Sequence, residues 1–256
     1  MSERSQNTRI FSAFILGITL GLGILGAGYC LNKAVLLSRQ ANRIVTVKGL
    51  AERDVKADVA VYEIDYREVG GDLNELHTRL NRDQLVVMAF LKDHGLTDAE
   101  FGPQPIKLED KVANAYQNGN TITPDQRYVL TGGMRVRSSK VEVIREINQL
   151  TGTLLQQNVP LTFDSSGLSY NPSYYFTQLD HIRPEMLADA THSARLVAAQ
   201  FAKDAETELN GIQRASQGVF QIMSRDAASS DSGGDGGMAA IDKKVRLVTT
   251  IDYRLK

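Results

Sequence analysis

Cysteine, serine and histidine carry most nucleophilic catalysis, so their positions are the first test for an enzyme. Covalent catalysis needs a nucleophile with a base within hydrogen-bonding reach. The only cysteine, Cys30, lies inside an apolar run, and no serine stands in a Gly-x-Ser-x-Gly elbow. His77 and His94 fall within one expected helix, where we interpret them as structural or surface residues. The sequence therefore predicts no catalytic residue.

Metal and cofactor sites need ligands at characteristic spacings. His181 and His192, with Asp189 between them, are eleven residues apart, whereas two histidines that bind a metal from one helix lie three or four apart. The acidic, glycine-rich stretch 231–237 resembles the start of a calcium loop but has no closing glutamate. The chain contains neither the P-loop nor the dinucleotide-binding glycine motif. We expect no metal ion and no cofactor.

The overall charge excludes another class of protein. The 256 residues include 29 Lys and Arg against 30 Asp and Glu, which gives a net charge of −1 at pH 7. A dedicated nucleic-acid binder normally carries a basic excess, so we expect no nucleic-acid partner. A single cysteine also excludes an intrachain disulfide framework.

Residues 10–31 form the most distinctive segment, a run of 22 positions without a charge. A helix of this length spans about 33 Å, enough to cross the hydrocarbon core of a bilayer. We predict an uncleaved transmembrane anchor, with apolar positions that include Ile10, Leu16, Leu20 and Leu31.

Two other fates of this segment stay open. A cleaved signal peptide would have small residues before the cleavage site, which Ala27 could supply, and a shorter apolar run. A lipoprotein would be anchored through Cys30, but Tyr29 occupies the position where a small residue is expected.

The remaining sequence predicts an α+β fold with the order ββα–ββα–βαββ, in which antiparallel strands carry helices on one face. We assign residues 1–41 to the tail and anchor and 42–256 to one α+β domain. Alternation of apolar and polar residues predicts strands at 44–47, 58–67, 101–110, 127–137, 159–170, 212–223 and 244–255. Polar or Ser/Gly/Asp-rich composition predicts loops at 111–126 and 227–237.

Three helices follow from capping residues and apolar spacing. The first begins at Asp72 and ends at Gly95, the second begins at Ser139, and the third begins near Pro184 and ends at Asn210. The third is expected to bury a stripe at spacings of three and four: Leu187, Ala190, Ala194, Val197, Phe201, Ala205 and Leu209. Gly132 and Gly133 predict a β-bulge in their strand.

An aromatic cluster is the candidate contact surface. Tyr170, Tyr174, Tyr175 and Phe176 lie in a connection that contains Pro172, where no helix stripe requires large rings. Aromatic residues in loops often anchor partner contacts. The alternative interpretation is that they cover the open end of the sheet core.

Several segments resemble the SIMPL-domain family (DUF541), in order along residues 42–256. They are the glycine-containing strand and the following strand at 47–60, the helix end at 91–96, the short strand at 159–169 and the helix at 187–205. The chain departs from the family pattern at Ala57, where many members have proline, and in the long insertion at 227–237. The resemblance implies a bacterial cell-envelope protein with an α+β fold. Some members form ring- or channel-like oligomers or are linked to oxidative-stress tolerance, and no reaction, cofactor or catalytic residue is established for the family.

These observations together predict a non-enzymatic, single-pass inner-membrane protein whose body lies in the periplasm. It would act through homo-oligomerisation or partner binding, in a stress-related role, without a known small-molecule ligand. One alternative is an envelope enzyme or ligand-binding protein with a cleft that uses Glu109, Asp110 and Arg127. Another is a periplasmic protein released after signal cleavage.

Overall fold

The computed structural model of the chain describes residues 21, 23, 25, 27–29, 31–33, 43–115, 123–162, 171–226 and 237–256. The fold is α+β with antiparallel sheets and several helices, which confirms the predicted class. The chain divides into two compact units. Unit 1 comprises Met1–Ala51, Leu187–Val219 and Val248–Lys256, and unit 2 comprises Glu52–Met186 and Phe220–Leu247.

The predicted anchor lies mostly outside this description. Ile10, Leu16 and Leu20 are not among the described residues, and Leu31 is exposed. In the described part of the chain, no helix has both the length and the hydropathy that a membrane crossing requires.

A five-stranded sheet forms the centre of unit 2. Its order is β3-β5-β2-β6, and β4 also pairs with β5. The long β2–β5 pair is antiparallel and keeps an unbroken register over 11 residue pairs. The strands are β2 (Val59–Gly70), β3 (Phe101–Pro103), β4 (Lys107–Asp110), β5 (Tyr128–Ser138) and β6 (Ser173–Tyr175).

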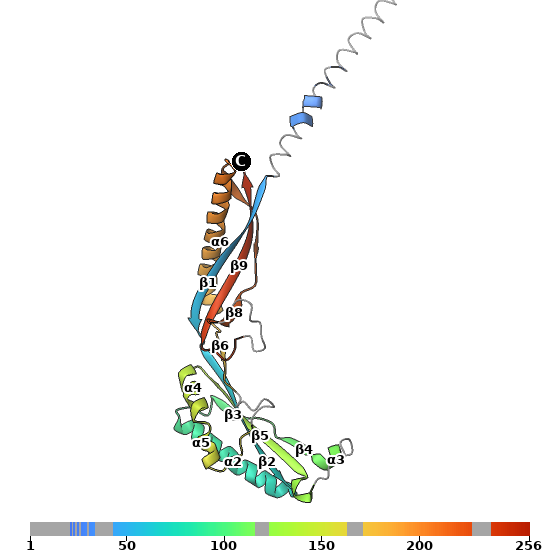
Figure 1. Cartoon of the computed structure of the whole chain (residues 1–256), viewed down its shortest axis with the longest axis vertical. Helices are drawn as coiled ribbons and strands as arrows, with labels where there is room; N and C mark the ends of the chain where they lie inside the picture. Colours follow the sequence, from blue (N-terminus) through green and yellow to red (C-terminus); the bar gives the residue numbers. More distant parts are fainter. Residues whose placement is uncertain are drawn as a thin grey trace, which may run out of the picture. The chain divides into compact units, whose positions relative to one another are not determined.

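Three helices, α2 (Leu73–Asp93), α4 (Val141–Leu150) and α5 (Thr153–Gln156), lie on one side of β2 and β5 (Figure 1). Side chains alternate along β2 between this covered face and an open one. The covered face includes Tyr62, Ile64 and Tyr66, which belong to the main core. Two short elements, α3 (Lys111–Ala115) and η1 (Pro124–Gln126), precede β5.

Both ends of α2 confirm the prediction from sequence. The carboxylate of Asp72 accepts hydrogen bonds from the backbone N–H groups of Asn74 and Glu75 at the N-terminus. After the C-terminus, Gly95 adopts a φ of +86°, a left-handed conformation that glycine takes without strain.

The expected bulge at Gly132 and Gly133 is wrong, because the β2–β5 register passes through both residues without a shift. The two glycines instead leave room for side chains of β2. A Cβ on Gly132 would lie 2.9 Å from the Tyr66 ring, and one on Gly133 would overlap the Asp65 carboxylate.

Two further boundaries differ from the prediction. The stretch 159–162 pairs with β2 only through the isolated bridge Tyr66↔Leu161, and the strand that borders β2 is β6. The helix α4 begins at Val141 after Lys140, which makes no side-chain cap, so the cap expected at Ser139 is wrong.

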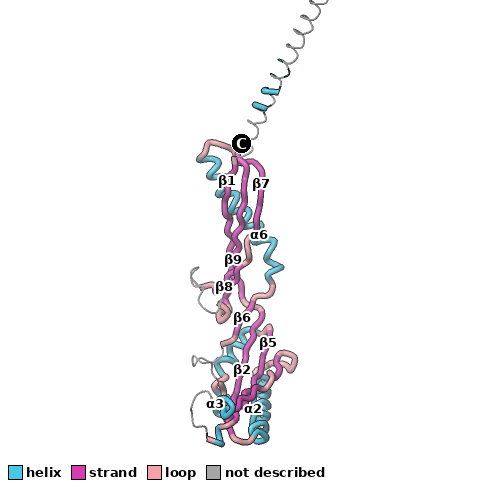
Figure 2. Tube along the Cα trace, turned by 90° about the vertical axis from the view of Figure 1, so that its right-hand side faces the viewer, coloured by secondary structure: helices cyan, strands magenta, loops and turns pink. Residues whose placement is uncertain are grey.

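The second sheet has the order β1-β9-β7, and β8 also pairs with β9. Figure 2 shows β9 running between β1 and β7. In unit 1, the second half of α6 (Leu179–Asp204) packs on this sheet, with Val47, Ala194, Ala198, Ile251 and Tyr253 in its core. The strands are β1 (Ile44–Lys56), β7 (Leu209–Gln217), β8 (Gln221–Ser224) and β9 (Asp242–Leu255).

The helix α6 begins earlier than expected, so Pro184 lies inside it, and it ends at Asp204 rather than at Asn210. The chain turns at Glu206, which has a φ of +52°, a conformation that glycine usually supplies at a helix end. The Asn-Gly pair expected to end the helix therefore lies in β7.

Candidate interaction surface

Alanines pack α6 against the sheet of unit 1. Ala190, Ala194, Ala198 and Ala202 recur every fourth residue, and all four are buried. On β1, Gly49 lies so close to the helix that a Cβ would overlap the Ala190 carbonyl oxygen and would lie 2.8 Å from the Cβ of Ala194. Only small side chains therefore fit between the helix and the strand.

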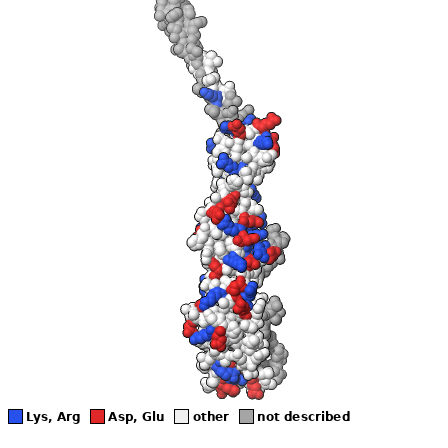
Figure 3. Space-filling view, turned by 90° about the vertical axis from the view of Figure 1, so that its left-hand side faces the viewer, with Lys and Arg blue, Asp and Glu red and all other residues white. Residues whose placement is uncertain are grey.

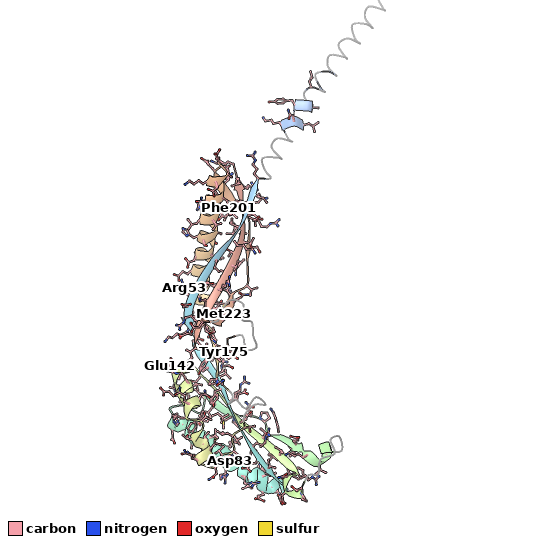
Figure 4. The ribbon with its side chains drawn as sticks, in the orientation of Figure 1. Arg53, Asp83, Glu142, Tyr175, Phe201 and Met223 are labelled. Atoms are coloured by element: carbon pink, nitrogen blue, oxygen red, sulfur yellow. The ribbon has the colours of Figure 1, made fainter. Side chains whose placement is uncertain are left out.

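Beside this alanine row, larger apolar side chains in the second half of α6 lie at the surface. The sequence predicted Val197 and Phe201 in the buried stripe, and this is wrong, because they are 41% and 54% exposed. Leu196 beside them is 60% exposed. We call these three residues the α6 ridge; Phe201 is labelled in Figure 4. Adjacent exposed apolar side chains are typical of a contact surface.

The strand β7 is a fully exposed edge of the sheet, apart from the half-buried Leu209. Within the described residues, its only strand partner is β9. The N–H of Gly218 donates to the Val248 carbonyl, so antiparallel alternation directs every second N–H of β7 toward β9. The N–H and C=O groups of Ala215 and Gln217 therefore point away from β9, toward the open edge.

Natural edge strands usually carry charges, prolines or bulges that prevent pairing with another chain. β7 has one charged residue, Arg214, and no proline. Its register with β9 shifts on both sides of Ile212, but it is regular from Arg214 to Gln217. The stretch 214–217 is therefore a regular edge with little protection.

Charges of both signs are mixed on one face of the molecule. On the face drawn in Figure 3, the Lys and Arg side chains of the described residues are interspersed with Asp and Glu. The features of unit 1 that suit recognition are the backbone edge of β7 and the exposed apolar side chains of α6.

Unit 2 contains a pair of buried carboxyl groups. Asp83 of α2, labelled in Figure 4, is fully buried, and Glu68 of β2 is 9% exposed. Arg82 donates two hydrogen bonds to Oδ1 of Asp83, at 3.2 and 2.8 Å. Nε of Arg79 lies 3.3 Å from Oε2 of Glu68.

The surroundings raise the pKa of Glu68. Burial raises it most, Arg79 opposes this, and the neighbouring Asp83 carboxyl raises it further. Oδ2 of Asp83 is buried and has no donor in the described structure, and a protonated Glu68 would supply one. Burial, Asp83 and Asp65 also raise the pKa of Tyr66 to about 12.

The sequence carried an unrecognised signal for this pair. The apolar positions of α2 leave a gap between Leu80 and Val87, and Asp83 fills it three residues after the first and four before the second. An acidic residue at a core-facing position indicates a buried carboxylate. Its partner, Glu68, is set by the packing of α2 on β2.

The comparison with known families settles the relationship. The model of the SIMPL family, a protein of unknown function (DUF541), matches residues 45–251, which include all of unit 2 and part of unit 1. The chain belongs to the SIMPL family. A comparison with curated proteins gives no match.

In this SIMPL protein the predicted aromatic cluster does not form one surface. Tyr174 is buried in the main core, next to Ala60 in the β2–β6 pair. Tyr175 is exposed and its hydroxyl lies 3.9 Å from Sδ of Met238, while Phe176 is half-buried. Tyr170 lies outside the described residues.

The histidines of this SIMPL protein are dispersed. Nδ1 of His77 lies 3.2 Å from the amide nitrogen of Asn81, and Nδ1 of His94 lies 2.7 Å from the Phe90 carbonyl. His181 and His192 are exposed on α6. Across the described ranges, no group of three His, Cys, Asp or Glu side chains is placed to hold a metal ion.

The three polar residues of the alternative cleft lie at the surface. Arg127 pairs with Asp110 at 3.0 Å and stacks on Tyr128, and this ion pair lowers the pKa of Asp110. Glu109 is exposed on β4. In the described part, neither the hollow of about 550 Å³ beside Arg135 nor that of about 490 Å³ beside Tyr174 is lined by these three residues.

Proposed function

We propose that this SIMPL protein is a membrane-anchored cell-envelope protein that associates with further copies of itself through unit 1. The proposal assigns it a binding role and no reaction. The anchor is the uncharged run 10–31, and the body would lie on the periplasmic side of the inner membrane.

The observation that carries the proposal is the open edge of β7. An exposed edge with free N–H and C=O groups is a template for a strand of another chain. Ala215 and Gln217 offer four outward backbone groups, and each hydrogen bond contributes about 0.5–1.5 kcal/mol. The sum of about 2–6 kcal/mol falls short of the roughly 8 kcal/mol that micromolar affinity requires. Pairing at this edge therefore needs further support.

Two features supply that support. The α6 ridge adds apolar area in the same unit. The anchor would confine copies to one layer, which raises their effective concentration. Unit 1 follows the apolar run closely, since the N–H of Leu255 donates to the carbonyl of Arg43 at 2.9 Å.

The test is the molar mass of the full-length protein in detergent, measured by light scattering over a concentration series. We expect an oligomer for the wild type. Ala215→Pro removes an outward N–H without removing a bond to β9, so we expect it to lower the mass, and Ala215→Ser to leave the mass unchanged. A monomeric wild type, or an Ala215→Pro variant with the wild-type mass, would refute the proposal.

The ridge is tested in the same way. Phe201→Ser should weaken the oligomer, whereas Leu85→Ser, which changes an exposed apolar residue of α2, should not. Equal effects of the two variants would assign the change to general surface polarity and would remove the ridge from the proposal.

The anchor has its own test. The intact mass of the protein extracted from membranes should equal that of the uncleaved chain. A mass that lacks the N-terminal segment including most of the apolar run would replace the anchor with a cleaved signal peptide.

A further inference from the structure

We propose that a groove on the open face of the unit 2 sheet binds a small aliphatic dicarboxylate. The groove has a volume of about 550 Å³ and is lined by residues 99–105 together with Glu63, Arg135 and Arg137. Small-molecule sites commonly occupy about 300–1,000 Å³. All of the lining residues belong to unit 2.

The strand register places two arginines side by side in this groove. Arg135 of β5 lies between Glu63 of β2 and Gly102 of β3. Arg137 is two residues further along β5, so both side chains point to the same face, with Cα atoms about 7 Å apart. This face is opposite the one that α2, α4 and α5 cover.

A missing side chain creates the space beside them. A Cβ on Gly102 would meet no atom within 4 Å. Any larger residue at this position of β3 would project toward the volume next to Arg135. The groove therefore depends on a glycine for its depth, which offers a way to close it without altering a charge.

The positive charge of the groove is only partly compensated. Oε1 of Glu63 lies 3.5 Å from Nε of Arg135, a loose and exposed ion pair. In the described structure, no carboxylate pairs with the guanidinium of Arg137.

The backbone carbonyl of Glu100 accepts the backbone N–H of Arg137, but the Glu100 carboxylate binds other residues. Oε1 accepts from the Ser138 hydroxyl, and Oε2 accepts from Thr97 and Lys140. The Ser138 hydrogen bond is the main reason that the pKa of Glu100 is lowered to about 2. The short contacts of this carboxylate are therefore with Thr97, Ser138 and Lys140 and not with Arg137.

These features define the class of ligand. A guanidinium presents paired N–H donors that match a carboxylate, and two of them on one face match a molecule with two carboxylates. Phosphate carries its charge on one compact centre, so it matches two separate guanidinium groups less well than a molecule with two carboxylates at its ends. Ala99 and Pro105 give the groove apolar wall for a short methylene chain. Succinate is the simplest probe with this chemistry.

Calorimetric titration of the full-length protein in detergent with succinate at low salt tests the proposal. We expect saturable binding that Arg137→Gln weakens by about tenfold or more, the loss expected for a charged hydrogen-bonding partner. Gly102→Val should weaken it similarly by filling the groove. The control Arg67→Gln removes the same charge from the same open face of the sheet outside the groove, and it should bind like the wild type.

Further probes separate recognition from simple charge attraction. Succinamide, the neutral analogue, should not bind, and inorganic phosphate should bind more weakly than succinate. The proposal is overturned if succinate does not bind, if Arg137→Gln and Gly102→Val bind like the wild type, or if phosphate binds as tightly. Circular dichroism checks the fold of each variant, and the molar mass of the same samples reports separately on self-association.

Discussion

Replacing Glu68 by Gln should change how stability depends on pH. Because the pKa of Glu68 is raised from its ordinary 4.5, chiefly by burial, the folded chain holds this proton more tightly than the unfolded chain. The resulting stabilisation is fully present below pH 4.5 and is lost as the pH rises through the raised pKa. Glutamine imitates the protonated form, because its amide can donate to Asp83 at every pH.

The size of the effect follows from linkage. A tenfold difference in proton affinity corresponds to about 1.4 kcal/mol. Through Glu68 alone, the free energy of unfolding of the wild type should fall by up to about 1.4 kcal/mol per pH unit between the ordinary and the raised pKa. The Glu68→Gln variant lacks this dependence. The difference in unfolding free energy, variant minus wild type, should therefore rise with pH across this interval.

Urea unfolding followed by circular dichroism from about pH 4 to pH 8 measures this difference, in which the other titrating groups cancel. Glu75→Gln is the matched control, because the Glu75 carboxylate also lies near Arg79, at 3.9 Å, but is exposed. Its difference from the wild type should stay flat. A Glu68→Gln difference that is constant or falls with pH would refute the shared proton between Glu68 and Asp83.

Two further predictions concern local packing and capping, and both are measured by urea unfolding. Gly49→Ala should lower the free energy of unfolding by about 1–3 kcal/mol or more, because the new methyl meets the backbone of α6. Gly211→Ala should change it by no more than about 0.5 kcal/mol, since a Cβ there meets no atom within 4 Å. Equal losses in the two variants would contradict the close contact of β1 with α6. Asp72→Ala should lower the free energy of unfolding by about 1 kcal/mol, because the N-terminal cap of α2 is lost. Asp98→Ala removes an exposed ion pair with Lys92 and should lower it by less than about 0.5 kcal/mol. A larger loss for Asp98→Ala than for Asp72→Ala would contradict the capping role.

Local signals predicted the parts of the fold in which a residue acts on its own neighbours. Asp72 and Gly95 end α2 as expected, and the alternation in β2 gives its covered and open faces. The order of elements follows the prediction in large part: the strands expected at 101–110 and 212–223 are each divided in two. The exceptions are β6, which takes the place expected for a strand at 159–170, and α3 and η1, which lie in the expected loop 111–126.

The predictions are wrong where contacts with a distant part of the chain determine what a residue does. Gly132 and Gly133 predicted a bulge, but they accommodate side chains of β2, which precedes them by more than 60 residues. Glu206 ends α6 in a conformation for which the sequence offers no glycine. Neither outcome can be deduced from local propensity.

The candidate surfaces could not be predicted from the sequence for the same reason. Whether a strand such as β7 is an edge depends on which strands pair beside it, and the groove beside Arg135 depends on the register of β3, β5 and β2. The apolar spacing of α6 gave the right helix but the wrong face, because it cannot tell that β1 approaches closely enough to accept only alanines.

The α6 ridge is more than a by-product of that close approach. Other exposed positions of the same helix carry Arg195, Gln200 and Lys203, so polar residues are compatible with this surface. Leu196, Val197 and Phe201 are exposed on this helix as well, and exposed apolar side chains raise the risk of aggregation. The proposed self-association accounts for them through a partner copy that covers them. If Phe201→Ser leaves the molar mass of the full-length protein unchanged, that explanation fails, whatever the edge of β7 does.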